Sequence, residues 1–318
     1  MINFESIPGS NSKVAFHSRP KGVIQFIGGF ISGSFPQSNF RSLFQHLYDQ
    51  GYSLIVYNFP FNPLQFNHWS VAVKILKDLY QVRFEIIKKR FCSTDREQLL
   101  EFYADDSNYF WLGYSLGCKY ILLLEIISDN YDNFQRRNQI LSDCLLEDFI
   151  KIKEDIEQAD SYRDLAINKI SELLGSPYEL NYFIKDQPSL LIAPEINNTV
   201  EILNQPISLF SFWDFPSREK VQCLIKKSTE IFNLMGLMSF AQDTIARDDV
   251  SFLTLQLSNR SFTPFLHQKF EGTHNKLLEN DQNLGACINL ILQELKQRQL
   301  TNTAKAVQCQ GSLGCKIN

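Results

Sequence analysis

The sequence predicts an α/β fold with a mainly parallel sheet flanked by helices. Short runs rich in β-branched and aromatic residues alternate with longer segments whose apolar residues recur at helical spacing. The run 52–59 is mostly apolar and ends before Pro60, as expected for a strand covered on both faces. The chain has 318 residues, 44% hydrophobic and 21% charged, which is typical of a globular protein with a sizeable core.

The first 128 residues contain the clearest alternation of strand and helix patterns. One stripe of apolar residues at helical spacing, from Val71 to Ile86, marks a long helix, and Gly51 is placed to end the helix before it. The expected strands are 13–18, 22–27, 52–59 and 108–112, and the expected helices are 39–50, 68–91 and 116–128.

The segment 129–186 breaks this alternation and is expected to be a helical insertion. Apolar residues mark one amphipathic helix over 141–156 and a second over 166–174, which Gly175 can close. Between Asp143 and Asp164 there are eight acidic and three basic residues. This acidic face is either a solvated surface or part of a cap over the sheet, and both interpretations remain open.

The alternation then resumes up to the C-terminal region. The polar, aperiodic tail 299–318 is expected to be disordered, so that 1–298 forms a single domain that includes the insertion. The expected strands are 189–193, 231–240 and 262–270, and the expected helices are 217–227, 250–257 and 275–297.

Charge and composition exclude several classes of function. With 31 Lys and Arg against 35 Asp and Glu, the net charge of −4 argues against nucleic acid as a partner. The seven scattered cysteines include no Cys-x-x-Cys pair, and the five histidines lack metal-ligand spacing, so we expect no disulfide framework, metal or cofactor. The sequence shows no secretion signal and no apolar segment long enough to cross a bilayer, so we expect a cytoplasmic protein.

One motif carries chemistry, the sequence Gly113-Tyr114-Ser115-Leu116-Gly117. It follows a predicted strand and opens a predicted helix, which is the context of a nucleophile elbow. A strand that turns directly into a helix strains the residue at its apex, and Gly113 and Gly117 remove side chains that would collide across the turn. The pattern therefore predicts Ser115 as a nucleophile.

Such a serine needs a histidine as base and an acid that orients it, in the chain order Ser, acid, His. His274 lies on a loop just after the predicted strand 262–270, whereas His267 lies within that strand and is expected to be structural. Asp243 directly follows the strand 231–240 and is the expected acid. The alternatives are Asp248 and Asp249, which are placed to cap the next helix, and Glu195, which follows the preceding strand.

An oxyanion hole needs two backbone N–H donors near the nucleophile. One is expected from Leu116, the residue after Ser115. The other is expected from the loop after the strand 22–27, where Phe30 is favoured and Gly29 is next. The role of His68 stays open, because it could lie near the site or cap the helix that it begins.

Together these residues resemble the α/β-hydrolase superfamily, and more narrowly an uncharacterised branch of it, domain of unknown function family 1350, found in oxygenic phototrophs. The resemblance implies a serine-hydrolase scaffold and no known substrate. The chain departs from the family's usual pattern at Asn67, where an aspartate is usual, and after His274, where Asn275-Lys276 replaces Leu-Thr-Pro. The matching segments are Phe26 to Phe30 with Gly33 and Pro36, Gly51-Tyr52, Phe66-Asn67-His68, Gly113 to Lys119, and Ser239 to Ile245.

The sequence thus favours a serine hydrolase of the esterase, lipase or thioesterase type that acts on a small-molecule ester or thioester through an acyl-enzyme. The alternative is a binding or assembly protein that keeps the hydrolase scaffold without turnover, since a fold does not fix a function. Neither the substrate nor the oligomeric state follows from the sequence.

Overall fold

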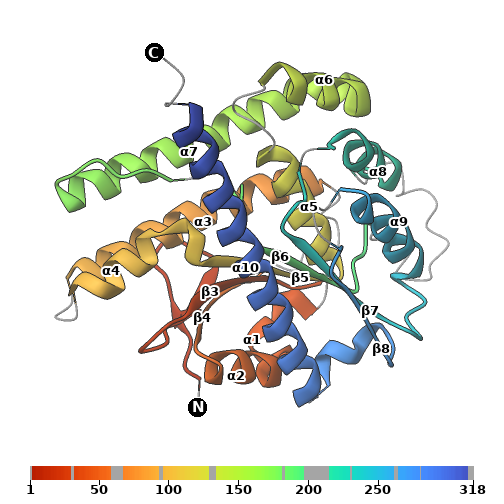
Figure 1. Ribbon diagram of the computed structural model, residues 1–318, viewed down its shortest axis with the longest axis horizontal. Helices are drawn as coiled ribbons and strands as arrows, with labels where there is room; N and C mark the ends of the chain where they lie inside the picture. Colours follow the sequence, from red (N-terminus) through yellow and green to blue (C-terminus); the bar gives the residue numbers. More distant parts are fainter. Residues whose placement is uncertain are drawn as a thin grey trace.

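The computed structural model confirms the α/β fold (Figure 1). It describes residues 2–29, 32–58, 67–92, 96–128, 134–180, 183–196, 215–229, 231–260, 264–279 and 281–313. The described strands form one eight-stranded sheet in the order β1-β2-β4-β3-β5-β6-β7-β8. The pairs β1–β2 and β2–β4 are antiparallel, and the remaining pairs are parallel. The strands are β1 (Glu5–Ser6), β2 (Ser12–Ala15), β3 (Gly22–Ile27), β4 (Tyr52–Tyr57), β5 (Tyr109–Tyr114), β6 (Ser189–Ile192), β7 (Met235–Phe240) and β8 (His267–Phe270).

Helices cover both faces of this sheet (Figure 1). On one face α2 and α10 pack together over β4, β6 and β7, and on the other α3, α5 and α8 form the larger part of the core. The helices are α1 (Pro36–Asn39), α2 (Arg41–Asp49), α3 (His68–Phe91), α4 (Arg96–Ala104), α5 (Leu116–Ser128), α6 (Phe134–Leu145), α7 (Phe149–Leu174), α8 (Arg218–Lys227), α9 (Arg247–Ser258) and α10 (Gln282–Leu313).

The central elements begin and end where their sequences predict. Strand β3 and helices α3 and α5 have the expected bounds. Helix α3 starts at His68 because the Asn67 side chain caps it, accepting the N–H of Ser70 at 2.9 Å. Strand β3 is buried along its whole length between β4 and β5, which agrees with a central strand covered on both faces.

The helical insertion is divided differently from the expectation. The break falls at Leu146–Asp148, a short 3-10 turn in which Leu146 has φ +47°. Helix α7 then runs without interruption over Phe149–Leu174, and Gly175 caps its end. The expected helix over 141–156 is therefore wrong, because it spans this break. Helix α7 packs along α3, and α6 packs on α8, so both lie outside the helices that cover the sheet.

Several C-terminal bounds also differ. Strand β7 starts at Met235, four residues later than expected, and β8 starts at His267. The last helix α10 begins only at Gln282, and it continues to Leu313. The expectation of a disordered tail from 299 is therefore wrong up to Leu313, and residues 314–318 lie outside the described ones.

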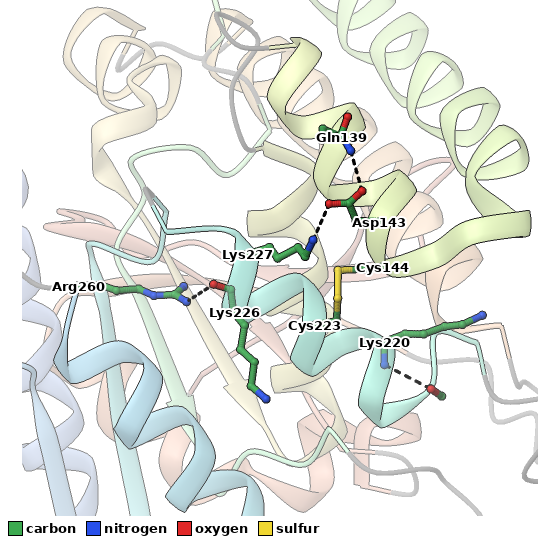
Figure 2. Close-up of a disulfide and its surroundings, with 9 residues drawn as sticks. Gln139, Asp143, Cys144, Lys220, Cys223, Lys226, Lys227 and Arg260 are labelled. Atoms are coloured by element: carbon green, nitrogen blue, oxygen red, sulfur yellow. Dashed lines mark hydrogen bonds and ion pairs between the residues drawn. A yellow bond between two sulfur atoms is a disulfide. The ribbon is translucent and has the colours of Figure 1, made fainter.

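The expectation that the cysteines form no disulfide is also wrong. Cys144 on α6 is bonded to Cys223 on α8, 79 positions later in the chain (Figure 2). An ion pair between Lys227 of α8 and Asp143 of α6 lies beside the bond. No local spacing reveals this pair, because only the packing of α6 on α8 brings the two cysteines together. The disulfide ties the insertion to the helices over the sheet.

Candidate active site

The turn between β5 and α5 has the geometry that the Gly-x-Ser-x-Gly motif predicts. Ser115 stands alone between the end of β5 at Tyr114 and the start of α5 at Leu116, and its φ is +54°. This left-handed conformation is strained for a residue with a side chain. Hydrogen bonds hold the turn, because the Ser115 N–H donates to Ile192 O at 3.0 Å and its carbonyl accepts from Cys118 N at 3.0 Å.

The two glycines of the motif are explained by close backbone approaches. A Cβ on Gly113 would lie 3.1 Å from the backbone of Cys118, across the turn, as predicted. A Cβ on Gly117 would lie 2.1 Å from the carbonyl oxygen of Ile27, on the neighbouring strand β3. Gly117 is thus required by the contact between α5 and β3, and the expected collision across the turn itself does not explain it.

The fold brings Asp243 and His274 to Ser115. The Ser115 Oγ lies 2.9 Å from Nε2 of His274, and the Nδ1 of His274 lies 2.8 Å from Oδ2 of Asp243. Asp243 follows β7, and His274 begins a short 3-10 turn (His274–Leu278) that follows β8, so both stand beyond the carboxyl ends of their strands. All three side chains are buried.

Two further contacts fix the orientation of His274 and Asp243. The Tyr114 hydroxyl donates to the carbonyl of His274 at 2.8 Å, and the two rings lie 5.5 Å apart. The second carboxylate oxygen of Asp243 accepts the N–H groups of Ile245 and Ala246, both at 2.9 Å. Burial alone would raise the pKa of Asp243, but its hydrogen bonds to His274 and to these N–H groups outweigh it and lower the pKa. Asp243 therefore stays ionised at neutral pH.

Of the expected oxyanion donors, Gly29 and Leu116 lie within the described residues. Gly29 approaches the nucleophile closely, because a Cβ there would lie 3.0 Å from Ser115 Cβ and 3.3 Å from its Oγ. Leu116 begins α5, so its N–H is one of the first-turn donors that have no acceptor within the helix. Phe30 lies outside the described residues.

The sequence predicts Glu195 only as a substitute for Asp243, and the structure gives it a different position. Its Oε2 accepts the Ser115 hydroxyl at 3.0 Å, and its N–H donates to the Ser115 carbonyl at 3.2 Å. The available signal was its place just after β6, the strand beside β5, since the carboxyl ends of adjacent parallel strands meet.

The other candidates lie elsewhere or serve the structure. Asp249 is buried on α9, where it pairs with Arg218 at 2.8 Å and accepts the N–H of Ile196 at 2.7 Å. His267 contacts the hydroxyl of Ser239 at 2.8 Å. Asn67 caps α3, and His68 is instead buried with Nδ1 2.9 Å from the Tyr120 hydroxyl. Asp248 lies in the first turn of α9, which starts after Ala246.

Two further properties bear on the kind of site. In the part of the chain that the structure describes, no group of three or more His, Cys, Asp or Glu side chains could hold a metal ion. The helices within those same ranges include none that is both long and apolar enough to pass through a bilayer.

Solved structures with a similar fold include esterases. An inhibited form of esterase B from Lactobacillus rhamnosis is 12% identical, with a TM-score of 0.53 over 96% of this chain and 90% of that one. The same enzyme with a tributyrin phosphonate is 11% identical, with a TM-score of 0.52 over 97% and 88%. The fluorophosphonate-binding serine hydrolase F of Staphylococcus aureus is 11% identical, covering 92% and 97%, with a TM-score of 0.49. No curated protein matches the chain.

These similarities and the strand order show an α/β-hydrolase fold. The family model described as "Protein of unknown function (DUF1350)" matches residues 4–290, nearly the whole chain. The family resemblance expected from the sequence is confirmed, and the chain belongs to the DUF1350 family.

Proposed function

We propose that this protein is a serine hydrolase that cleaves a small-molecule ester or thioester through an acyl-enzyme on Ser115. The observation that carries the proposal is the continuous chain of hydrogen-bond distances from Ser115 Oγ through His274 to Asp243, at 2.9 and 2.8 Å. A serine hydroxyl is a weak nucleophile by itself, and it needs an adjacent base that is held in the correct orientation.

In the proposed reaction the Ser115 oxygen attacks the acyl carbon while its proton passes to Nε2 of His274. Asp243 accepts Nδ1–H of the ring, which leaves Nε2 free to take the proton, and the ionised carboxylate stabilises the imidazolium that forms. The tetrahedral intermediate collapses as His274 returns the proton to the departing alcohol or thiol. Water, activated by His274 in the same way, then releases the acid and restores Ser115.

The developing negative charge on the acyl oxygen needs N–H donors near Ser115. Leu116, at the first turn of α5, supplies one in this proposal, and the loop that follows β3 supplies the other. The approach of Gly29 to Ser115 supports this part of the proposal, because that loop runs within contact distance of the nucleophile. Loss of one such donor typically costs about 3 kcal/mol of transition-state stabilisation.

A fluorophosphonate probe tests the proposal, because it forms a stable adduct with an activated serine. Wild-type protein should be labelled, and Ser115→Ala should not. Ser251→Ala is the matched control, since Ser251 is an exposed serine on α9 far from the motif in sequence, and it should label like the wild type. A folded wild-type protein that never labels would refute the proposal and favour the alternative, a binding or assembly protein on this scaffold. A positive result should be followed by hydrolysis of p-nitrophenyl esters of graded chain length.

A further inference from the structure

Glu195 presents a second carboxyl group to the proposed nucleophile, in addition to that of Asp243. Only 1% of the residue is exposed, and its Oε2 lies 3.0 Å from Ser115 Oγ. Glu195 takes no part in the proposed transfer of the serine proton to His274. A buried carboxyl in contact with the reacting oxygen of an enzyme must affect the reaction in at least one of its two charge states.

The backbone around Glu195 holds it in this position. Its N–H donates to the Ser115 carbonyl at 3.2 Å, and the next residue, Ile196, donates its N–H to Asp249 at 2.7 Å. Asp249 is itself anchored by Arg218 on α8 at 2.8 Å. The segment after β6 is thus attached at successive residues to the Ser115 turn and to α9, so the contact with Oγ is a built feature of the site.

The charge of Glu195 decides which acceptor receives the hydroxyl hydrogen of Ser115. The hydroxyl carries one hydrogen, and two acceptors lie within reach, His274 Nε2 at 2.9 Å and Glu195 Oε2 at 3.0 Å. A neutral glutamic acid donates its own hydrogen to Oγ and leaves the serine hydrogen for His274. A glutamate takes the serine hydrogen for itself, and its negative charge opposes the oxyanion that attack would create.

The groups around Glu195 act on its charge in opposite directions. Burial, the largest effect, raises the pKa of Glu195 to about 7, and Asp249 on α9 adds to the rise. His274, the Ser115 hydroxyl and Lys119 on α5 favour the ionised form. On the same helix, the neighbouring thiol of Cys118 is buried, and burial raises its pKa, so it stays neutral in this range.

We propose that Glu195 is a proton-controlled switch on Ser115, which permits attack while its carboxyl group is neutral and blocks attack when it is ionised. The switch rests on the proposed hydrolase function and adds a residue to it. The proton involved leaves Glu195 for the solvent, and no other bond changes. The enzyme therefore loses activity on the alkaline side of Glu195 ionisation, unlike a serine hydrolase without such a group.

The rate of fluorophosphonate labelling between pH 5.5 and 9.5 tests the switch. In the wild type the rate should fall tenfold per pH unit above the midpoint of Glu195 ionisation. Glu195→Gln keeps a neutral hydrogen-bond donor of similar shape at Oγ, so its rate should show no alkaline fall and should exceed the wild-type rate about 100-fold two units above that midpoint. Glu219→Gln is the matched control, because Glu219 also feels the charge of Lys119 but is exposed on α8, and its profile should follow the wild type.

A folded Glu195→Gln variant with the same alkaline fall as the wild type would overturn the proposal, as would a wild-type rate that stays level to pH 9.5. If Glu195→Gln does not fold, the wild type decides. An infrared carbonyl band of a neutral carboxyl group that disappears at the midpoint of the rate profile supports the switch, and a band that titrates elsewhere overturns it. Failure of the hydrolase proposal is distinct, because then neither the wild type nor Ser115→Ala labels at any pH.

Discussion

Replacement of Gly117 by alanine tests the contact between the serine turn and strand β3. The new Cβ would lie 2.1 Å from the carbonyl oxygen of Ile27 and 2.7 Å from that of Gly28, both backbone atoms. Ordinary van der Waals contact begins at 3.4 Å, so α5 and the end of β3 must separate by about 1.3 Å along the shorter contact. Strand β3 cannot yield easily, because it is hydrogen-bonded to β4 on one side and β5 on the other.

Overpacking of this kind costs about 3 kcal/mol at its usual upper end, while alanine gains about 1 kcal/mol over glycine within a helix. We therefore expect Gly117→Ala to lower the free energy of unfolding by about 2 kcal/mol. Because Gly28 precedes the loop that approaches Ser115, the same displacement should also slow fluorophosphonate labelling. A misplacement of about 1 Å costs roughly 100-fold in rate.

Urea denaturation, followed by the intrinsic fluorescence, measures the first effect, and the labelling rate measures the second. Gly175→Ala is the control, since Gly175 ends α7 with φ +67° and a Cβ there meets nothing within 4 Å. It should lose about 1 kcal/mol through backbone strain alone and label at the wild-type rate. A Gly117→Ala protein with wild-type stability would refute this account of the glycine.

Three further predictions concern the site and the disulfide. Asp243→Asn should lower the labelling rate roughly 10⁴-fold, because an amide no longer selects the His274 tautomer in which Nε2 is the acceptor. A folded variant whose labelling rate falls less than tenfold would contradict the role of Asp243. The pKa of Glu195 is raised to about 7 by burial, so the folded state holds a proton that the unfolded state has lost, and stability should fall as the pH rises from about 4.5 to 7, by about 3 kcal/mol at most. Calorimetry across this range should show a smaller decrease for Glu195→Gln, and an equal decrease in both proteins would contradict the assignment. The Cys144–Cys223 bond closes a loop of 79 positions and so reduces the conformational entropy of the unfolded chain. Replacing both cysteines by serine restores that entropy and should lower the free energy of unfolding by about 4 to 5 kcal/mol. Denaturation of the oxidised and the doubly substituted proteins measures this loss, and equal midpoints would contradict it.

The disulfide also bears on the expected cytoplasmic location, which stays a prediction. Disulfides are rare in reducing compartments, where free thiols are kept reduced. Thiol labelling of protein taken directly from its cells, followed by mass spectrometry, would show whether Cys144 and Cys223 are bonded there. Bonded cysteines would argue for an oxidising compartment, and free thiols would agree with the cytoplasm.

Local patterns in the sequence predicted the elements that build the site. The turn at Ser115 depends on glycines two positions to either side, and α3 and α5 depend on apolar residues and caps a few positions apart, so a short window contains the cause of each. Asp243 and His274 could be chosen because the order of strands along a parallel sheet brings the loops at their carboxyl ends together. The structure agrees with that prediction: Nδ1 of His274 lies 2.8 Å from Oδ2 of Asp243, and its Nε2 lies 2.9 Å from Oγ of Ser115.

Tertiary structure alone decided the contacts between segments far apart in the sequence. The approach of Glu195 to Ser115, the bond between Cys144 and Cys223 and the contact of Gly117 with Ile27 each join elements that no common period relates. The uninterrupted course of α7 and the extension of α10 to Leu313 likewise escaped the pattern of apolar residues. Sequence periodicity indicates which face of a helix or strand is buried. Which other element packs against that face depends on how the layers of the fold are arranged. The charge of a buried group such as Glu195 depends in turn on the side chains that this packing brings next to it.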